Sequence, residues 1–392
     1  MTFCSSLFNL ESRTKVVYGC DAVTRVGLLA RELDGQSALL VTDPGVHGAG
    51  HCDHVRKILE ASGVRVNIFD GVHENPTTDD VNACVAKAQA ADSPIDLIVG
   101  LGGGSSLDTA KGCNFLLTNG GEMVDYWGVG KADRPMLPLI AIPTTAGTGS
   151  ECQSFALIAD AKNHQKMACG DPKAAAAIAI LDPKLTTTLP PLVTACTGLD
   201  AITHAVESFV TTRRNAFSTM VAAQSFSLLI SHFHLVLSKP DDLEARGAML
   251  WSASLAGMAI ENSMLGAAHA AANPLTARYG MTHGHAVGLM LPHVIRFNAQ
   301  DHKTQIQYAQ LACSAGCVMQ DADESTATHA LLACIEEQLG LTGLSCTIHG
   351  CGVKESAIVD LADEAVQQWT AQFNPRPIAR NDFIALYKAA FN

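Results

Sequence analysis

Paired cysteine motifs and basic regions are missing from this sequence, and each gap argues against a class of function. Thirteen cysteines are scattered along the 392 residues without a CxxC pair, which argues against a cysteine-ligated zinc site. Lysine and arginine together number 26 against 38 aspartate and glutamate residues, so the net charge is −12 and no basic face is indicated. We therefore expect neither nucleic acid nor a membrane among the partners.

Export signals and membrane spans are also missing from the pattern. The first fifteen residues hold no basic segment followed by a long apolar run, so we expect no signal peptide. The stretch 248–260, AMLWSASLAGMAI, is interpreted as the most apolar part of the chain, and it is shorter than the ~20 residues that a membrane span needs. Since the cysteines follow no disulfide framework, they are expected to be reduced thiols in a cytoplasmic protein.

The chain has two halves with different hydrophobic patterns, and its length of 392 residues exceeds one ordinary core. In the first half, short apolar runs alternate with helical patterns, which is typical of βαβ units and a parallel sheet. We therefore predict an α/β domain over 1–188 and an all-helical domain over 189–392. The predicted strands of the first half lie in 37–45, 64–71, 96–104, 138–145, 155–160 and 176–183, and its predicted helices include 54–62 and 79–91.

Long helical patterns fill the second half, which begins near Pro190 and Pro191. Phe217, Val221 and Leu228 are predicted to share one face of such a helix.

A glycine turn at 96–111, DLIVGLGGGSSLDTAK, joins an apolar strand to the start of a helix. Gly102, Gly103 and Gly104 can adopt positive φ and let a phosphate approach the backbone. Ser105 and Ser106 can cap the helix, whose free N–H groups and dipole favour an anion such as a pyrophosphate. The run departs from GxGxxG because Ser105 takes the last glycine position, so a tight turn without a ligand is the alternative.

Two further features favour a dinucleotide over an empty turn. The segment 143–151, PTTAGTGSE, is a second small and hydroxyl-rich loop that follows a strand. Asp43 ends the predicted strand at 37–45, where a carboxylate can accept a hydrogen bond from a ribose 2′-hydroxyl and repel a 2′-phosphate. This position favours NAD over NADP, although Asp43 can also be a simple turn residue before Pro44.

Histidines and one carboxylate indicate a metal site in the second half. GLDAITHAVES places Asp200 and His204 one helical turn apart. GAAHAAANPLTARYGMTHGH adds His269, His283 and His285 in a bed of small residues. One carboxylate with several imidazoles suits Fe²⁺ or Zn²⁺. The chain has fifteen histidines, however, so each one alone is better explained as a buried ring with satisfied hydrogen bonds or as an exposed one.

These motifs together resemble the iron-containing (group III) alcohol dehydrogenases. GGGSSLDTAK, IPTTAGTGSE, GLDAITHAVES and GAAHAAANPLTARYGMTHGHAVGLMLPHV follow that family's order and spacing over nearly the whole chain. The resemblance implies the fold that this family shares with dehydroquinate synthase: an α/β dinucleotide-binding domain followed by an all-α metal-binding domain. It implies an NAD(H)-linked, metal-dependent alcohol dehydrogenase or aldehyde reductase, with Fe²⁺ or Zn²⁺, a small alcohol or aldehyde as substrate, and a homo-oligomeric assembly.

The resemblance also assigns residues to these roles. The implied metal ligands are Asp200, His204, His269 and His283. The implied NAD contacts are Asp43, Gly102, Gly103, Gly104, Ser105, Asp108, Thr144, Thr145, Thr148 and Lys166.

Asn273 departs from the family pattern. Many members carry a histidine there, close to the nicotinamide and the substrate, and that histidine has been considered for proton transfer. An asparagine hydrogen-bonds but does not exchange a proton near neutral pH. His285, two residues after a ligand, is a candidate substitute, with a surface contact or a contact behind the ligands as its alternative role. Asn273 can equally bind a polar substrate.

Two functions of other classes compete with the dehydrogenase. A non-redox lyase of the dehydroquinate synthase type would also use NAD and a metal, but it would need basic residues around a phosphorylated substrate. A catalytically inactive NAD- and metal-binding protein is the second alternative, and Asn273 is the feature that favours it.

Overall fold

The computed structural model describes residues 8–11, 13–162 and 165–392, which divide into two compact units. The first unit runs from Glu11 to Leu189, and the second from Pro190 to Asn392 together with residues 8–10. The boundary between the units lies at the paired prolines, and each unit is described by itself below.

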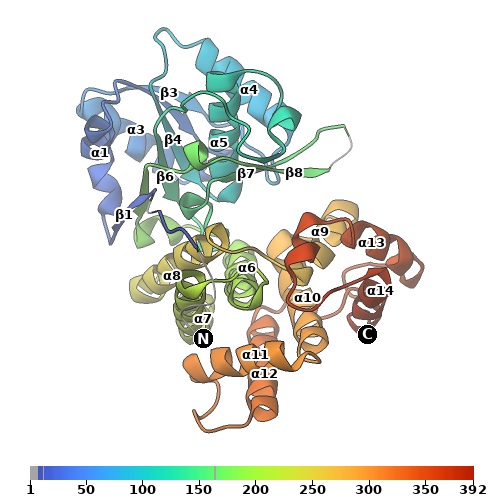
Figure 1. Cartoon of the computed structure of the whole chain (residues 1–392). Coiled ribbons are helices and arrows are strands. Elements are labelled where there is room, and N and C mark those ends of the chain that lie inside the picture. The colour runs from blue at the N-terminus through green and yellow to red at the C-terminus, as the bar shows by residue number, and fades with distance from the viewer. Residues whose placement is uncertain (1–7, 12, 163–164) are drawn as a thin grey trace. The chain divides into compact units, whose positions relative to one another are not determined.

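A six-stranded parallel sheet, in the order β1-β9-β6-β4-β2-β3, forms the centre of the first unit (Figure 1). The apolar runs that predicted strands all lie in strands, which confirms the α/β class. The edge strand β1 was not anticipated, because it has four residues and its two ends are exposed. The strands are β1 (Lys15–Tyr18), β2 (Ser37–Val41), β3 (Arg65–Phe69), β4 (Leu97–Gly102), β6 (Leu139–Pro143) and β9 (Ile178–Leu181).

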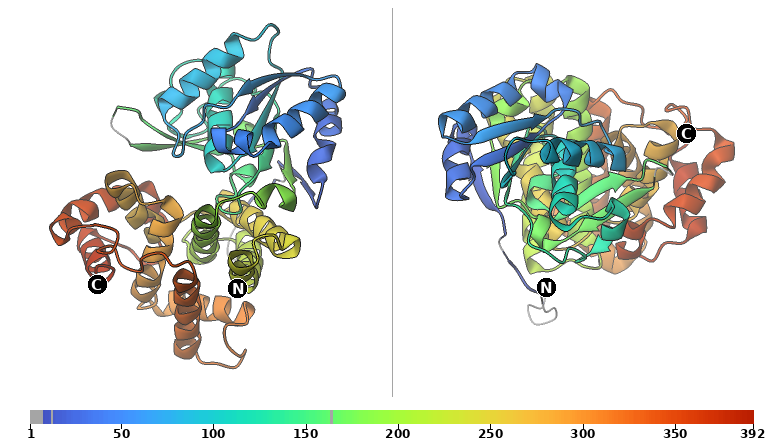
Figure 2. Two further views of the ribbon diagram at one scale, coloured as in Figure 1. Left: turned by 180° about the vertical axis from the view of Figure 1, so that it is seen from behind. Right: turned by 90° about the horizontal axis from the view of Figure 1, so that it is seen from above.

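Helices cover both faces of this sheet, and alternate strand residues pack on opposite sides. In β2, Ala38 and Leu40 belong to the core that contains α1 (Val26–Glu32) and α3 (His51–Ala61). Leu39 and Val41 belong to the core that contains α4 (Thr78–Gln89) and α5 (Gly104–Asn119). Strands buried on both faces read as continuous apolar runs, which is why the sequence revealed them so clearly. Figure 2 shows this unit from two further sides.

A smaller three-stranded sheet and several short helical turns complete the first unit. In its order β5-β8-β7, only β7 coincides with a predicted extended segment. The remaining elements are β5 (Gly128–Val129), β7 (Phe155–Ala159), β8 (Lys166–Gly170), α2 (Pro44–Gly48) and the 3₁₀ turns η1 (Ala22–Arg25), η2 (Met123–Tyr126), η3 (Ser150–Cys152), η4 (Pro172–Ala174) and η5 (Pro183–Thr186).

The second unit is helical, as predicted. Its elements are α6 (Pro191–Val210), α7 (Ala216–Ser238), α8 (Leu243–Glu261), α9 (Ala267–Tyr279), α10 (His283–Asn298), α11 (His302–Ser314), α12 (Glu324–Leu341), η6 (Glu355–Ala357), α13 (Ile358–Ala365), η7 (Trp369–Phe373) and α14 (Arg380–Ala389). Within this unit α6 packs against α7, α8 and α10, and α9 packs against α10 and α13.

The predicted face of α7 was partly wrong. Val221 is buried, but Phe217 and Leu228 are only half-buried. The buried face is turned toward small residues such as Ala222 and Ser225, which are fully buried. Small side chains at these positions allow neighbouring helices to approach closely, and the buried face also includes large residues such as Phe226 and Phe233.

By length and composition, α7 is also the one helix among the described residues that could cross a membrane. An 18-residue window of it has a mean hydropathy of 1.5 and is 39% buried within the structure. The sequence interpretation took 248–260 as the most apolar stretch, but the helix that passes this test is α7. Phe226, Leu229 and Phe233 of α7 are fully buried, which is the packing of a core helix.

Candidate active site

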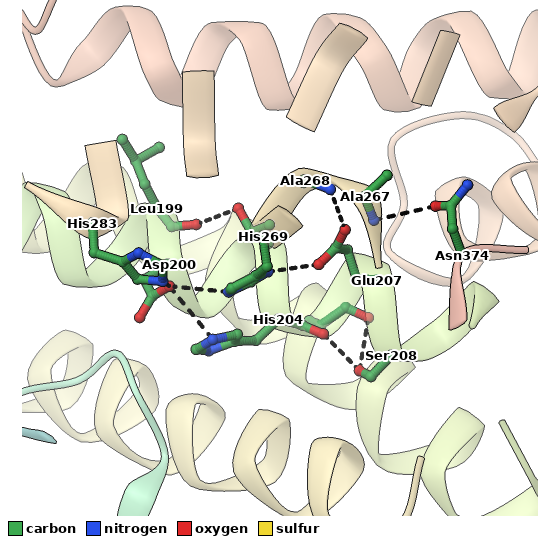
Figure 3. Close-up of polar contacts among 12 residues, drawn as sticks. Leu199, Asp200, His204, Glu207, Ser208, Ala267, Ala268, His269, His283 and Asn374 are labelled. Atoms are coloured by element: carbon green, nitrogen blue, oxygen red, sulfur yellow. Dashed lines mark hydrogen bonds and ion pairs between the residues drawn. The ribbon is translucent and has the colours of Figure 1, made fainter. Parts of the chain in front are cut away.

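Four side chains from three helices converge in the second unit (Figure 3). Asp200 Oδ1 lies 3.4 Å from His204 Nε2, 3.6 Å from His269 Nε2 and 3.9 Å from His283 Nε2. The rings of His204 and His269 stack with centroids 4.8 Å apart. Asp200, His269 and His283 each offer a ligand atom, and these atoms all lie within 4.8 Å of one another. The structure thus brings together the four residues that were predicted to bind a metal.

Close helix packing carries these side chains to one point. Asp200 and His204 share a face of α6 because they are four residues apart. His283 is the first residue of α10, and Gly284 follows it. A Cβ atom on Gly284 would lie 1.9 Å from the Cys196 carbonyl oxygen, so only glycine allows α10 to meet α6 here. This contact sets His283 beside Asp200.

Three residues of the cluster are buried, His283 is half-buried, and the cluster has polar atoms that a cation would satisfy. Asp200 and His269 are each 4% exposed. Among the described residues, Asp200 Oδ1 and His269 Nε2 have no hydrogen-bond partner. Burial by itself raises the pKa of Asp200, but the charges of His204 and the other two histidines outweigh it and lower that pKa. One carboxylate and three imidazoles whose oxygen and nitrogen atoms face one another fit a divalent ion such as Fe²⁺ or Zn²⁺.

Glu207 stands behind this cluster, and the sequence interpretation missed it. Its Oε2 lies 2.6 Å from His269 Nδ1, and its Oε1 accepts a hydrogen bond from the Ala268 N–H at 2.7 Å. Burial lowers the pKa of His269, but Glu207 and Asp200 together raise it to about 9. Because a carboxylate only accepts, it selects the tautomer with the proton on Nδ1 and leaves Nε2 for a metal. The signal in the sequence was the i, i+4, i+7 spacing of Asp200, His204 and Glu207.

The described side-chain hydrogen bonds of Asn273 and His285 are to residues outside the four-residue cluster. The Asn273 side-chain amide donates to Gln368 Oε1 at 2.9 Å. His285, which is 9% exposed, places Nε2 2.7 Å from the Ser345 carbonyl oxygen. This contact is to a loop carbonyl and to none of the four clustered residues.

The glycine turn of the first unit joins β4 to α5 with one residue in the positive-φ region. Gly102 has φ of 146°, and a Cβ atom there would lie 2.4 Å from Ser106 Oγ. Gly103 is the N-cap in an extended conformation, and Gly104 begins the helix. The expectation that Ser105 or Ser106 caps the helix was wrong, because the chain turns before it reaches them. Ser106 instead donates to Asp43 Oδ2 at 3.1 Å.

The hydroxyl-rich loop after β6 packs directly on this turn. The Thr144 N–H donates to the Gly102 carbonyl at 3.0 Å. A Cβ atom on Gly103 would lie 3.2 Å from Thr145 Cγ2, and one on Gly104 would lie 2.6 Å from Thr148 Cγ2. The loop therefore frames the first turn of α5, where N–H groups lack acceptors within the helix. Half-exposed residues at this point are Gly103, Gly104, Ser105, Thr145 and Thr148.

The remaining predicted cofactor residues have contacts of their own. Asp43 caps α2 by accepting from the Val46 N–H at 2.9 Å, so its turn role is real. Asp108 is 8% exposed and accepts from Ser150 Oγ at 2.7 Å. Burial raises the pKa of Asp108, while Lys111 and Lys166 act against this rise. Lys166 begins β8 and is half-buried.

Comparison with known families decides the membership of the chain. The model described as "Iron-containing alcohol dehydrogenase" matches residues 13–183, and "Fe-containing alcohol dehydrogenase family, C-terminal" matches residues 194–391. The chain belongs to the iron-containing alcohol dehydrogenase family. This confirms the resemblance, the fold class and the expectation of an NAD-linked, metal-dependent alcohol dehydrogenase or aldehyde reductase. The lyase alternative is not favoured.

Individual relatives are similar to this chain over nearly its whole length. It is 37% identical to alcohol dehydrogenase 4 of Schizosaccharomyces pombe over 357 residues, which cover 91% of this chain and 82% of that protein. It is 33% identical to the NAD-dependent methanol dehydrogenase of Bacillus methanolicus, covering 95% and 97% of the two chains. The crystal structure of a 1,3-propanediol oxidoreductase matches with a TM-score of 0.94 at 31% identity, covering 98% of this chain and 100% of the other.

Proposed function

We propose that Asp200, His204, His269 and His283 bind the metal of this dehydrogenase. The observation that carries the proposal is a pair of buried atoms, Asp200 Oδ1 and His269 Nε2, which have no hydrogen-bond partner and lie 3.6 Å apart. A divalent ion held there would supply Lewis-acid stabilisation of the charge that develops on the substrate oxygen. Fe²⁺ is the ion that the family name favours, and the same ligands suit Zn²⁺.

The glycine turn and the threonine loop are proposed to bind NAD. The pyrophosphate would accept hydrogen bonds from the first N–H groups of α5 between Gly103 and Ser105, with Thr145 and Thr148 beside it. Asp43 would accept from a ribose 2′-hydroxyl and repel a 2′-phosphate, which favours NAD over NADP. The nicotinamide supplies the hydride chemistry when it is bound, and the protein supplies orientation and charge.

Proton exchange is proposed not to involve the side chain of residue 273. The Asn273 amide does not titrate near neutral pH, and it is hydrogen-bonded to Gln368. His285 is proposed to hold the loop at Ser345 rather than to carry a proton, because its Nε2 is already engaged there. The proton would then pass to water or to a hydroxyl of the substrate.

The substrate is proposed to be a short-chain alcohol or its aldehyde. Support comes from the relatives that are named for methanol and for 1,3-propanediol. A homo-oligomeric assembly is also proposed, supported by the family resemblance. A cytoplasmic location is proposed because the described cysteines are free thiols. The acidic net charge and the core packing of α7 support the absence of nucleic acid and membrane partners.

The test is NADH oxidation by the purified protein, loaded without oxygen with Fe²⁺ or with Zn²⁺, across a panel of aldehydes and ketones. We expect metal-dependent oxidation of NADH and much weaker oxidation of NADPH. Full activity after complete removal of metal would refute the metal assignment, and equal use of NADPH would refute the role of Asp43. Turnover of a substrate without any net change in NADH would favour the lyase.

A further inference from the structure

Lys111 is a fully buried charged side chain in the helix that follows the glycine turn. It is the last residue of the motif GGGSSLDTAK, lies on α5 and is 0% exposed. The cofactor site proposed above gives it no role. Burying an ammonium group is costly unless each of its three N–H donors finds an acceptor.

The contacts of Lys111 supply three acceptors for those three donors. Its Nζ donates to the Ser150 carbonyl oxygen at 2.6 Å, to Ser150 Oγ at 2.8 Å and to the Phe155 carbonyl oxygen at 2.9 Å. Ser150 Oγ donates in turn to Asp108 Oδ1, which lies 4.0 Å from Lys111 Nζ. The lysine thereby ties α5 to η3 and to β7 in one buried network.

This network ends on the residues that frame the dinucleotide turn. The Ser150 N–H donates to Thr148 Oγ1 at 3.3 Å. The Thr148 methyl group packs close to Gly104, since a Cβ atom on Gly104 would lie 2.6 Å from it. A continuous set of contacts therefore runs from Lys111 through Ser150 and Thr148 to the first residue of α5.

We propose that Lys111 and Asp108 are positioning residues that hold the threonine loop, Thr144–Thr148, against the N-terminus of α5. They thereby set the affinity for the dinucleotide. Asp108 acts through Ser150 and not as a direct cofactor contact, which changes the role that the family resemblance implied. The inference rests on the proposed NAD site and adds the groups that shape it.

A purely structural lysine is the competing explanation. Removal of such a lysine would lower the stability of the first unit but leave the NADH affinity of the folded protein unchanged. If Lys111 instead positions the threonine loop, its removal should change NADH binding without changing the chemical step. The dissociation constant for NADH rises, while kcat at saturating NADH and the metal content stay close to wild type.

The experiment compares Ser150→Ala and Lys111→Met with Lys173→Met as the matched control. Lys173 lies in the same unit, but its Nζ donates to the Ala132 carbonyl oxygen, away from the threonine loop. NADH binding to the metal-loaded full chain is followed by nucleotide fluorescence, together with kcat, melting temperature and metal content. Ser150→Ala keeps the ammonium and deletes one hydroxyl, so it tests the inference even where Lys111→Met does not fold.

We expect the NADH dissociation constant to rise about tenfold in Ser150→Ala and more in Lys111→Met, with kcat within about twofold of wild type. Lys173→Met should bind NADH as wild type does. An unchanged dissociation constant in folded Ser150→Ala would overturn the inference, whatever its melting temperature. A wild-type protein that does not bind NADH would instead overturn the proposed cofactor site, and the inference with it.

Discussion

The two units build their candidate sites from opposite materials. In the helical unit the site consists of side-chain atoms, Asp200 and three histidines, that point at one another from three helices. In the α/β unit it consists of backbone N–H groups that are accessible because Gly103 and Gly104 carry no side chain. The metal centre should therefore fail when atoms are removed, and the dinucleotide turn should fail when atoms are added.

Each unit also has a buried charged side chain behind the atoms that would contact the ligand, and its charge is opposite in sign to that of the proposed ligand. Glu207 lies behind His269 on the side away from Asp200, at 2.6 Å from Nδ1. Lys111 lies behind the threonine loop, at 2.6 Å from the Ser150 carbonyl. The Glu207 carboxylate orients the His269 imidazole and makes it a stronger ligand. The Lys111 ammonium instead fixes the carbonyl groups that accept its hydrogen bonds.

Removal of one ligand should have the largest effect. In Asp200→Ala we expect metal to be lost and kcat/KM to fall on the order of a thousandfold or more, since a catalytic metal supplies several kcal/mol. NADH binding should remain. Metal analysis and NADH titration check this, with His232→Ala as control, because His232 Nδ1 bonds only to the Leu228 carbonyl of its own helix in the described contacts. Metal retention in Asp200→Ala would disprove the assignment.

Addition of one methyl group should damage the other site. Gly102→Ala forces a side chain into φ of 146° and into contact with Ser106 Oγ. We expect NADH affinity to fall about tenfold to a hundredfold, equivalent to about 1–3 kcal/mol, with the metal content unchanged. Gly48→Ala is the matched control, since its Cβ atom would meet nothing within 4 Å. If Gly102→Ala bound NADH normally, the turn would not be the pyrophosphate site.

Neutralising the supporting anion should give a smaller effect. Glu207→Gln keeps the shape of the side chain but loses the charge that holds the Nδ1 proton of His269. We expect metal affinity, measured by competition with a chelator, to fall about tenfold, and most of kcat to return in excess metal. Glu244→Gln, at an exposed position in α8, serves as control. If both variants lost metal to the chelator equally, Glu207 would have no role in metal binding.

Replacing the amide at residue 273 should have the smallest effect. In Asn273→His, kcat/KM near pH 8 should stay within about threefold of wild type. A new ionisation near the ordinary histidine pKa of ~6.5 should appear in the pH profile, because an imidazole titrates there and an amide does not. A wild-type ionisation in this range that disappears in His285→Asn would instead make His285 the proton-exchanging group.

Local patterns were sufficient for most of the fold. Strands buried on both faces, such as β2 and β4, appear in the sequence as short continuous apolar runs. The same reasoning failed for β1, whose four residues carry little pattern, and for α7, whose buried face depends on which neighbours approach most closely. Both failures have one cause: burial is a property of the neighbours, and a single segment does not contain them.

Prediction of the site shows the same division. The Asp200 and His204 pair is visible as one helical turn, and the wider family pattern supplied His269 and His283. Glu207 and Lys111 were missed because their partners lie 62 and 39 residues away along the chain. A buried charge is recognisable by the groups that satisfy it, and these meet it only after folding.

The sequence by itself determined the two-unit α/β and helical order, five strands of the parallel sheet, the glycine turn, the candidate ligands and the family. These follow from short-range spacing and from residue type, which do not depend on the rest of the chain. Only the tertiary structure decided that Gly102 alone, among the three glycines of the turn, takes positive φ and that Glu207 and Lys111 lie behind the two candidate sites. It decided these points because conformation at a tight turn and pairing of a buried charge depend on atoms from distant segments that share the same small space.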